Sequence, residues 1–211
     1  MTERIFDLNF GVLLKPREIL KRELSFADSR LAAKRFLVWG FIVGLVLSIL
    51  AVFVDELPMV PEGTSGLEVA GAVLMALLFI SIFFSVAMFL YFGFTSGMDK
   101  LFSKLFKSNG TYAQNVYLQS VVDIPTMIIL ILMSIIASVV PVIAWIIMIL
   151  LVIMLFYSFY LSILASAVAN RIKVWQAFIA RMILLVILFG LLIVLIPILV
   201  FAIFSSIGFG V

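Results

Sequence analysis

Four long runs of uncharged, mostly apolar residues dominate the hydropathy pattern of the chain. They cover residues 36–54, 69–94, 124–169 and the stretch from 182 toward the C-terminus. A helix rises about 1.5 Å per residue and the hydrocarbon core of a bilayer is about 30 Å thick, so one crossing needs roughly 20 apolar residues. Each run is therefore long enough to cross a membrane at least once.

The third run is too long for a single crossing. Pro141 lies near its middle, where its missing N–H and its ring interrupt a helix, and Trp145 follows as an interfacial anchor. We therefore expect a tight hairpin at Pro141. The predicted spans are about 36–54, 69–94, 124–140, 142–169 and 182–207, the last kinked near Pro197.

The composition agrees with this interpretation. Apolar residues make up 66% of the chain and the mean hydropathy is +1.37, whereas a soluble domain is roughly 45–50% apolar. The sequence thus predicts an all-α, polytopic membrane protein with a bundle of five transmembrane helices. We expect a cytoplasmic N-terminal segment over residues 1–35 and a transmembrane domain over residues 36–211.

The basic residues predict the orientation. Of the 14 Lys and Arg residues, eight precede the first span, three follow the second and three follow the fourth, whereas the loop after the first span carries only acidic charges. Cytoplasmic loops carry the excess of Lys and Arg. We therefore expect a multi-pass protein of the cell membrane with a cytoplasmic N-terminus and an external C-terminus. Anionic lipids of the cytoplasmic leaflet explain the same charges, so nucleic acid is not needed as a partner.

An amphipathic helix is predicted before the first span. Pro16 suits the first turn of a helix, and Ile19, Leu20 and Leu24 share one face, although Glu23 intrudes on it. The residues expected at the membrane surface are Lys15, Arg17, Ile19, Leu20, Lys21 and Arg22. Such a helix lies in the interface, either as an anchor at an anionic leaflet or as a sensor or docking segment for a partner.

A second helix is expected directly after this segment. Ser25 followed by Asp28 has the spacing of a capping box. The pattern predicts a helix that starts at Phe26 and continues into the first span.

The most informative polar residues precede the third span. Asn115, Gln119 and Asp123 are spaced to share one helix face. One interpretation is structural: Asp123 caps the third span with Pro125 in its first turn, and the two amides are wetted at the interface. The other is a polar functional site that faces the bundle interior, since ionisable residues at membrane depth are functional candidates by default.

Small residues are spaced for helix association. Gly40 and Gly44 form a G-x-x-x-G pattern in the first span, and Gly93 and Gly97 form another at the end of the second. Such spacing lets two helices approach closely. Ser158, Ser162 and Ser166 line one face of the fourth span, with hydrogen bonding between helices and a transport path as the two interpretations, and Ser81 and Ser85 pair on the second.

The composition also limits the chemistry. The chain contains no Cys and no His, which removes thiolate nucleophiles, the usual general base at neutral pH and the commonest metal ligand. No phosphate-binding glycine loop or cluster of carboxylates for a cation is present. We expect no enzymatic activity, no cofactor and no metal site.

Several short motifs resemble one family. The start Val12-Leu13-Leu14-Lys15-Pro16-Arg17-Glu18, the loop from Lys104 to Thr111 and the sequence Asp123-Ile124-Pro125 are similar to the prokaryotic branch of the Yip domain family, which is named for its interaction with Ypt/Rab GTPases. The resemblance extends from about Phe6 to Ile207 and implies a five-helix membrane bundle with a cytosolic N-terminus.

The chain departs from eukaryotic members of that family. Their Asp-Leu-Tyr-Gly-Pro motif is absent, with Asp28-Ser29-Arg30-Leu31-Ala32 before the first span, and Val121-Val122-Asp123 replaces their Gly-Tyr motif. Binding of a Rab protein is therefore not implied. The leading hypothesis is a non-enzymatic membrane scaffold that associates through its helices with itself or another membrane protein and acts in membrane organisation or trafficking. The alternative is a small-solute or ion transporter with a path lined by Asn115, Gln119 and Asp123.

Overall fold

The computed structural model describes residues 10–54 and 66–206, and every regular element in these two ranges is a helix. Three short elements come first: α2 (Val12–Leu14), α3 (Pro16–Glu23) and the 3-10 turn η2 (Leu24–Phe26). The long helices are α4 (Ser29–Val54), α5 (Gly66–Ser103), α6 (Tyr112–Val139), α7 (Ala144–Asn170) and α8 (Val174–Ser206). Two further 3-10 turns, η3 (Lys104–Phe106) and η4 (Pro141–Ile143), precede α6 and α7.

The predicted architecture is confirmed. Within the described ranges, five helices are long and apolar enough to cross a membrane, and they are the helices α4 to α8. The predicted hairpin is the turn η4, where α6 ends at Val139 and α7 begins at Ala144. α8 continues through Pro197.

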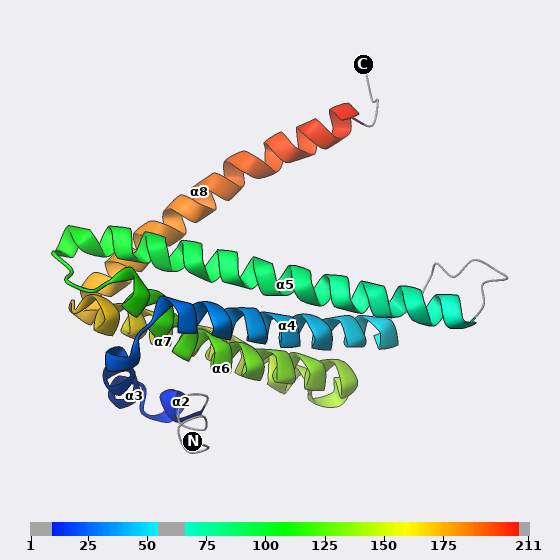
Figure 1. Ribbon diagram of the computed structural model, residues 1–211, viewed down its shortest axis with the longest axis horizontal. Coiled ribbons are helices and arrows are strands. Elements are labelled where there is room, and N and C mark those ends of the chain that lie inside the picture. The colour runs from blue at the N-terminus through cyan, green and yellow to red at the C-terminus, as the bar shows by residue number, and fades with distance from the viewer. Residues whose placement is uncertain (1–9, 55–65, 207–211) are drawn as a thin grey trace.

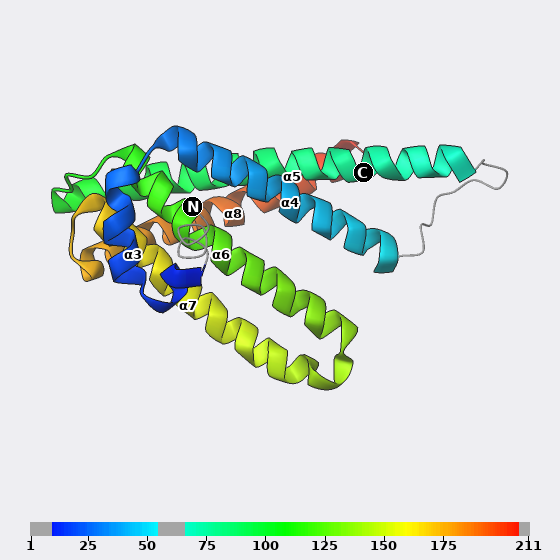
Figure 2. The ribbon, with the colours of Figure 1, turned by 60° about the horizontal axis from the view of Figure 1, so that its bottom comes forward.

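Four of the long helices form two pairs, and α8 packs against α5 and α7 before it leaves the bundle (Figure 1). α4 lies along α5, and α6 lies along α7 (Figure 1). The two pairs meet at the end of the bundle that carries α3 and separate toward the hairpin (Figure 2). Burial follows this arrangement, since residues 115–126 of α6 are buried and later residues of the helix are more exposed. The core therefore lies at the α3 end.

The helices at this end are longer than the predicted spans. α5 continues to Ser103, α6 already begins at Tyr112, and α8 begins at Val174. The predicted spans end where polar residues appear, because unpaired polar groups are costly at membrane depth. In the structure these polar residues lie inside the helices, where many of them bind one another.

The start of α4 also differs from the prediction. The helix begins at Ser29 and not at Phe26, because Asp28 is its cap: the Arg30 backbone N–H donates to the Asp28 carboxylate at 2.9 Å. The Ser25 hydroxyl instead donates to the Arg22 carbonyl at 3.0 Å. From Ser29 the helix runs without interruption across the boundary predicted at residue 35.

The amphipathic helix α3 packs on the bundle. Ile19 and Leu20 are buried in the same apolar cluster as Val12, residues of α6 and residues of α7. Lys21 and Arg22 are exposed on the opposite side, and so are Lys15 and Arg17. The apolar face, which the sequence predicts at the lipid, is therefore covered by protein, while the basic face is exposed.

The first glycine pair explains the close approach of α4 to α5. A Cβ added at Gly40 would lie 2.7 Å from the Ser85 Cα, and one at Gly44 would lie 2.7 Å from the Ser81 Cα. Any side chain would push the two backbones apart. Gly93 and Gly97 differ, because a Cβ at Gly93 would meet only the Tyr112 hydroxyl at 3.4 Å, and one at Gly97 would meet only the Tyr112 ring at 3.6 Å.

Candidate functional site

Polar side chains gather where α5, α6, α7 and α8 meet. On α6, Asn115 and Gln119 are 0% and 1% exposed, and Asp123 is 8% exposed. The face predicted from their spacing therefore points into the bundle. The interpretation of the two amides as groups wetted at the interface is wrong.

The cap interpretation of Asp123 is also wrong. α6 is capped at Thr111, whose hydroxyl accepts from the Gln114 N–H at 3.2 Å while the Gln114 side chain accepts from the Thr111 N–H at 3.0 Å. This reciprocal pair satisfies two N–H groups at the start of the helix. Asp123 and Pro125 consequently lie inside the helix, far from its first turn.

The buried amides connect α6 to two neighbours. The Asn115 side-chain amide donates to the Ser96 carbonyl of α5 at 2.7 Å, and its oxygen accepts from Asn170 of α7 at 3.3 Å. Asn170 also donates to Ser166. The side-chain amide of Asn115 thus both donates and accepts a hydrogen bond, and it links α6 to α5 and to α7.

Gln119 makes a two-way bond with Ser162 of α7. Its amide N–H donates to the Ser162 carbonyl at 3.1 Å, and its oxygen accepts from the Ser162 hydroxyl at 2.9 Å. Farther along the same helices, the Ser158 hydroxyl donates to Thr126 at 3.3 Å. Two of the three serines of α7, Ser158 and Ser162, therefore bind α6, whereas Ser166 accepts from Asn170 of its own helix.

An ion pair joins α8 to α5 in the same region. The Arg181 guanidinium binds the Asp99 carboxylate and also donates to the Ser162 hydroxyl. The Asp99 side chain is 1% exposed and that of Arg181 is 15% exposed. Buried charges in proteins are usually paired. Sequence reasoning missed this pair, because Arg181 was assigned to a loop and Asp99 to no role.

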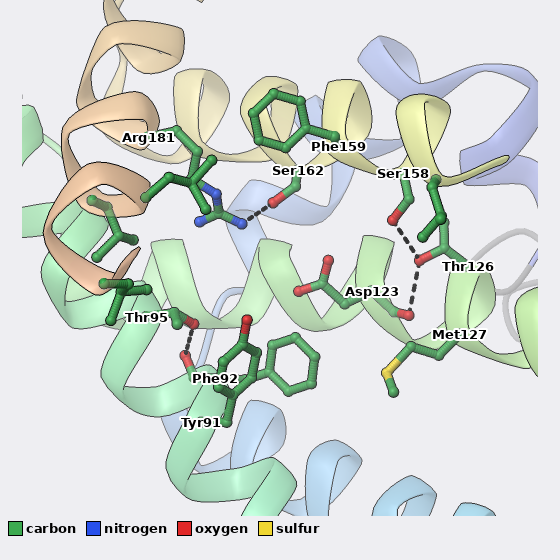
Figure 3. Close-up of a pocket in the computed structure, with 14 residues that line it drawn as sticks. Tyr91, Phe92, Thr95, Asp123, Thr126, Met127, Ser158, Phe159, Ser162 and Arg181 are labelled. Atoms are coloured by element: carbon green, nitrogen blue, oxygen red, sulfur yellow. Dashed lines mark hydrogen bonds between the residues drawn. The ribbon is translucent and has the colours of Figure 1, made fainter. Parts of the chain in front are cut away.

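A cavity of about 320 Å³ opens beside this ion pair. Its polar lining comes from Asp123, Arg181, Thr95, Thr126, Ser158 and Ser162, and its aromatic lining from Tyr91, Phe92 and Phe159. Figure 3 shows the Asp123 carboxylate directed toward the space bounded by Ser162, Arg181 and Tyr91. In the described part of the chain, neither a hydrogen bond nor an ion pair reaches that carboxylate.

A second polar cluster lies under α3. The Tyr117 hydroxyl of α6 donates to the Glu23 carboxylate at 3.0 Å, and Arg22 lies 3.4 Å from the same carboxylate. Arg35 of α4 donates to the Ser120 carbonyl at 3.4 Å. Glu23 interrupts the apolar face of α3 because it binds Tyr117 inside the bundle.

A basic groove lies at the edge of this end of the bundle. It has a volume of about 450 Å³ and is lined by Arg17 and Lys21 of α3 and by Arg171 and Lys173 between α7 and α8. Apolar side chains, including Leu24 and Leu164, complete its walls. The sequence predicts Arg17 and Lys21 at the membrane surface. In the fold, Arg171 and Lys173 lie in the same groove.

Across residues 10–54 and 66–206, no group of three or more His, Cys, Asp or Glu residues is placed to hold a metal ion. The polar residues instead link helices, line the cavity or line the basic groove. This arrangement defines a multi-pass helical membrane protein with a polar core at one end.

The family follows from a comparison of sequences. The chain matches the family model of the Yip1 domain over residues 10–208, which is nearly its whole length, and it belongs to that family. The match confirms the predicted family. Neither a search of curated proteins nor a search of solved structures returned a match.

Proposed function

We propose that this protein is a non-enzymatic membrane scaffold from the prokaryotic branch of the Yip1 family. It associates through transmembrane helices with a second copy of itself or with another membrane protein. It lies in the cell membrane with its N-terminus in the cytoplasm and its C-terminus outside. The distribution of Lys and Arg supports the orientation, and the missing eukaryotic motifs support the branch.

The observation that carries the scaffold proposal is the exposed length of α8. This helix leaves the bundle (Figure 1), and its large apolar residues from Val186 to Ile198 are exposed, except for Leu188, which is half-buried and lines the cavity. Gly190 lies in this stretch, and a Cβ added there would meet nothing within 4 Å. Small residues let a second transmembrane helix approach closely. In this proposal the partner helix therefore contacts α8 at Gly190.

Anionic lipid is the second partner in this proposal. The groove formed by Arg17, Lys21, Arg171 and Lys173 lies at the end of the bundle that we place in the cytoplasm. Basic pockets on the cytoplasmic side of transmembrane helices bind anionic headgroups. The apolar walls of this groove suit the part of an acyl chain that lies next to the headgroup. Lipid bound there would hold α3 against α7 and fix the bundle at the leaflet surface.

The hydrogen bonds of the buried polar residues support a non-enzymatic role, because they join helices to one another. Asn115 and Gln119 are engaged in bonds between helices, and the whole chain contains neither Cys nor His. The remaining candidate for chemistry is the Asp123 carboxylate, and a single carboxylate lacks the second acid or base that most hydrolytic mechanisms need.

The scaffold proposal is tested by the mass of the complex in native membranes. The full chain is extracted with its surrounding lipid into polymer-bounded nanodiscs and its mass is measured by native mass spectrometry. We expect a species with at least two copies, or with one copy and another membrane protein. A population made only of single chains and lipid contradicts the proposal. The same spectra report whether anionic lipid is retained, and substitution of Arg171 and Lys173 by Gln should release it.

A second function is favoured by one observation, the Asp123 carboxylate at the cavity. In a solute or ion pathway this residue would bind the permeant species, whereas Asn115 and Gln119 would have to break their bonds between helices to take part. Flux through liposomes that contain the pure protein, abolished by Asp123→Asn, would support this function. Absence of flux together with a stable complex supports the scaffold.

A further inference from the structure

Among the charged side chains that line the cavity beside Asp123 or pair with its lining, the acidic groups outnumber the basic ones. Two charged groups line it, Asp123 and Arg181. The charge of Arg181 is already matched by Asp99, to which it is ion-paired. Asp99, Asp123 and Arg181 are thus two acidic groups and one basic group, and the basic group is paired with Asp99 and not with Asp123.

The hydroxyl groups of Thr126 and Ser158, which line the same cavity, do not compensate this carboxylate. The Thr126 hydroxyl points to the backbone carbonyls of Val122 and Asp123, at 3.0 and 2.9 Å. The Ser158 hydroxyl donates to Thr126. Both donors are therefore occupied, and the Asp123 carboxylate faces the cavity without a donor from them (Figure 3). A buried carboxylate in this condition favours a cation in the cavity.

The walls indicate what kind of cation fits. Tyr91, Phe92 and Phe159 present aromatic rings, and five of the other lining residues are apolar, among them Leu155 and Leu184. Aromatic faces attract organic cations. A bare metal ion prefers several oxygen ligands, but Asp123 supplies the only carboxylate among the described residues of the lining. The volume of about 320 Å³ also exceeds the needs of a single metal ion.

We propose that this cavity is a binding site for a small organic ammonium ion. The positive nitrogen lies beside the Asp123 carboxylate, and the alkyl groups contact the aromatic and leucine side chains. The site does not depend on the scaffold function, since it lies inside one copy of the chain and needs no partner helix.

Calorimetric titration of the purified full chain tests the proposal, with choline as the probe. Its neutral analogue 3,3-dimethylbutan-1-ol has a carbon atom in place of the charged nitrogen and serves as the matched ligand control. We expect saturable binding of one choline per chain and binding of the alcohol that is at least about tenfold weaker, because charge and cation–π attraction are both lost.

Variants of the cavity show how much the carboxylate charge and an aromatic ring each contribute to choline binding. Asp123→Asn should weaken choline binding at least about tenfold, and Phe159→Leu should weaken it by a smaller factor. Glu18→Gln removes a carboxylate from the exposed side of α3 and should change nothing. Choline affinity that is equal in Asp123→Asn and the unaltered protein overturns the proposal, and so does equal binding of the alcohol. Saturable binding of Na⁺ without binding of choline also overturns it.

A measurement on the unaltered chain covers the case in which Asp123→Asn does not fold. Dicyclohexylcarbodiimide modifies carboxyl groups in apolar surroundings, and mass spectrometry locates the product. Choline should slow modification of Asp123, whereas the neutral alcohol should not. An unchanged rate of modification at saturating choline overturns the proposal.

Discussion

Arg181 of α8 binds Asp99 of α5, and this ion pair is the charged contact that holds the start of α8 to the bundle. Both partners are largely buried, and the same guanidinium donates to Ser162 of α7. One side chain of α8 therefore connects three helices. Beyond this point α8 leaves the bundle (Figure 1), so the pair fixes the place from which the helix diverges.

Removal of one partner of this pair should destabilise the protein strongly. Arg181→Met leaves the Asp99 carboxylate buried without its cation, and loss of one partner of a buried pair costs about 3–5 kcal/mol. The double variant Asp99→Leu and Arg181→Met removes both charges and should recover much of that loss. Thermal unfolding of the purified variants measures both effects. Equal unfolding temperatures for the single and double variants would refute this role of the ion pair.

The contact between α4 and α5 should not tolerate a side chain at Gly44. A Cβ there would lie 2.7 Å from the Ser81 Cα and 2.9 Å from the Phe84 Cβ. Overpacking of a tight contact costs about 1–3 kcal/mol, so Gly44→Leu should lower the thermal unfolding temperature. Gly71→Leu on α5 is the matched control, because nothing lies within 4 Å of a Cβ at that position. Similar losses in both variants would argue against a close helix contact at Gly44.

The cap of α6 should contribute measurable stability. Thr111→Val keeps the shape of the side chain but removes the hydroxyl that accepts from the Gln114 N–H. Loss of such a cap costs about 0.5–2 kcal/mol. Thr111→Ser keeps the hydroxyl and is the control. Unfolding temperatures that fall equally for Val and Ser would show that the hydroxyl does not act as a cap.

The orientation can be read with single cysteines, because the natural chain has none. Val142 in the hairpin is 89% exposed, and Lys107 before α6 is also exposed. A membrane-impermeant thiol reagent added to intact cells should label Val142→Cys and should label Lys107→Cys only after permeabilisation. The opposite pattern would place the N-terminus outside.

The number and order of the membrane helices could be predicted because span length depends only on helix rise and bilayer thickness. The hairpin at Pro141 followed from the same argument. The three polar residues of α6 were correctly placed on one face, since helical periodicity fixes which residues are neighbours. These properties are local or periodic, and one sequence is enough to reveal them.

Contacts between distant segments could not be predicted in this way. Thr111 followed by Gln114 has the spacing of a capping box, but Asp123 before Pro125 is an equally local signal at the expected membrane edge. The bonds between Thr111 and Gln114, which start α6 at Tyr112, decide between them. The pairing of Arg181 with Asp99 depends on how α8 packs against α5. The burial of Ile19 likewise depends on the position of α3 relative to α6 and α7.

The most direct test of the scaffold role is cysteine cross-linking along α8 in native membranes. A cysteine at Gly190 lies on the exposed part of the helix, whereas one at Ala165 of α7 is buried inside the bundle. After mild oxidation, Gly190→Cys should form a disulfide-linked dimer, or a cross-link to another membrane protein with a bifunctional thiol reagent, and Ala165→Cys should form neither. If Gly190→Cys is also recovered only as the monomer under both treatments, α8 does not mediate association and the scaffold account is contradicted.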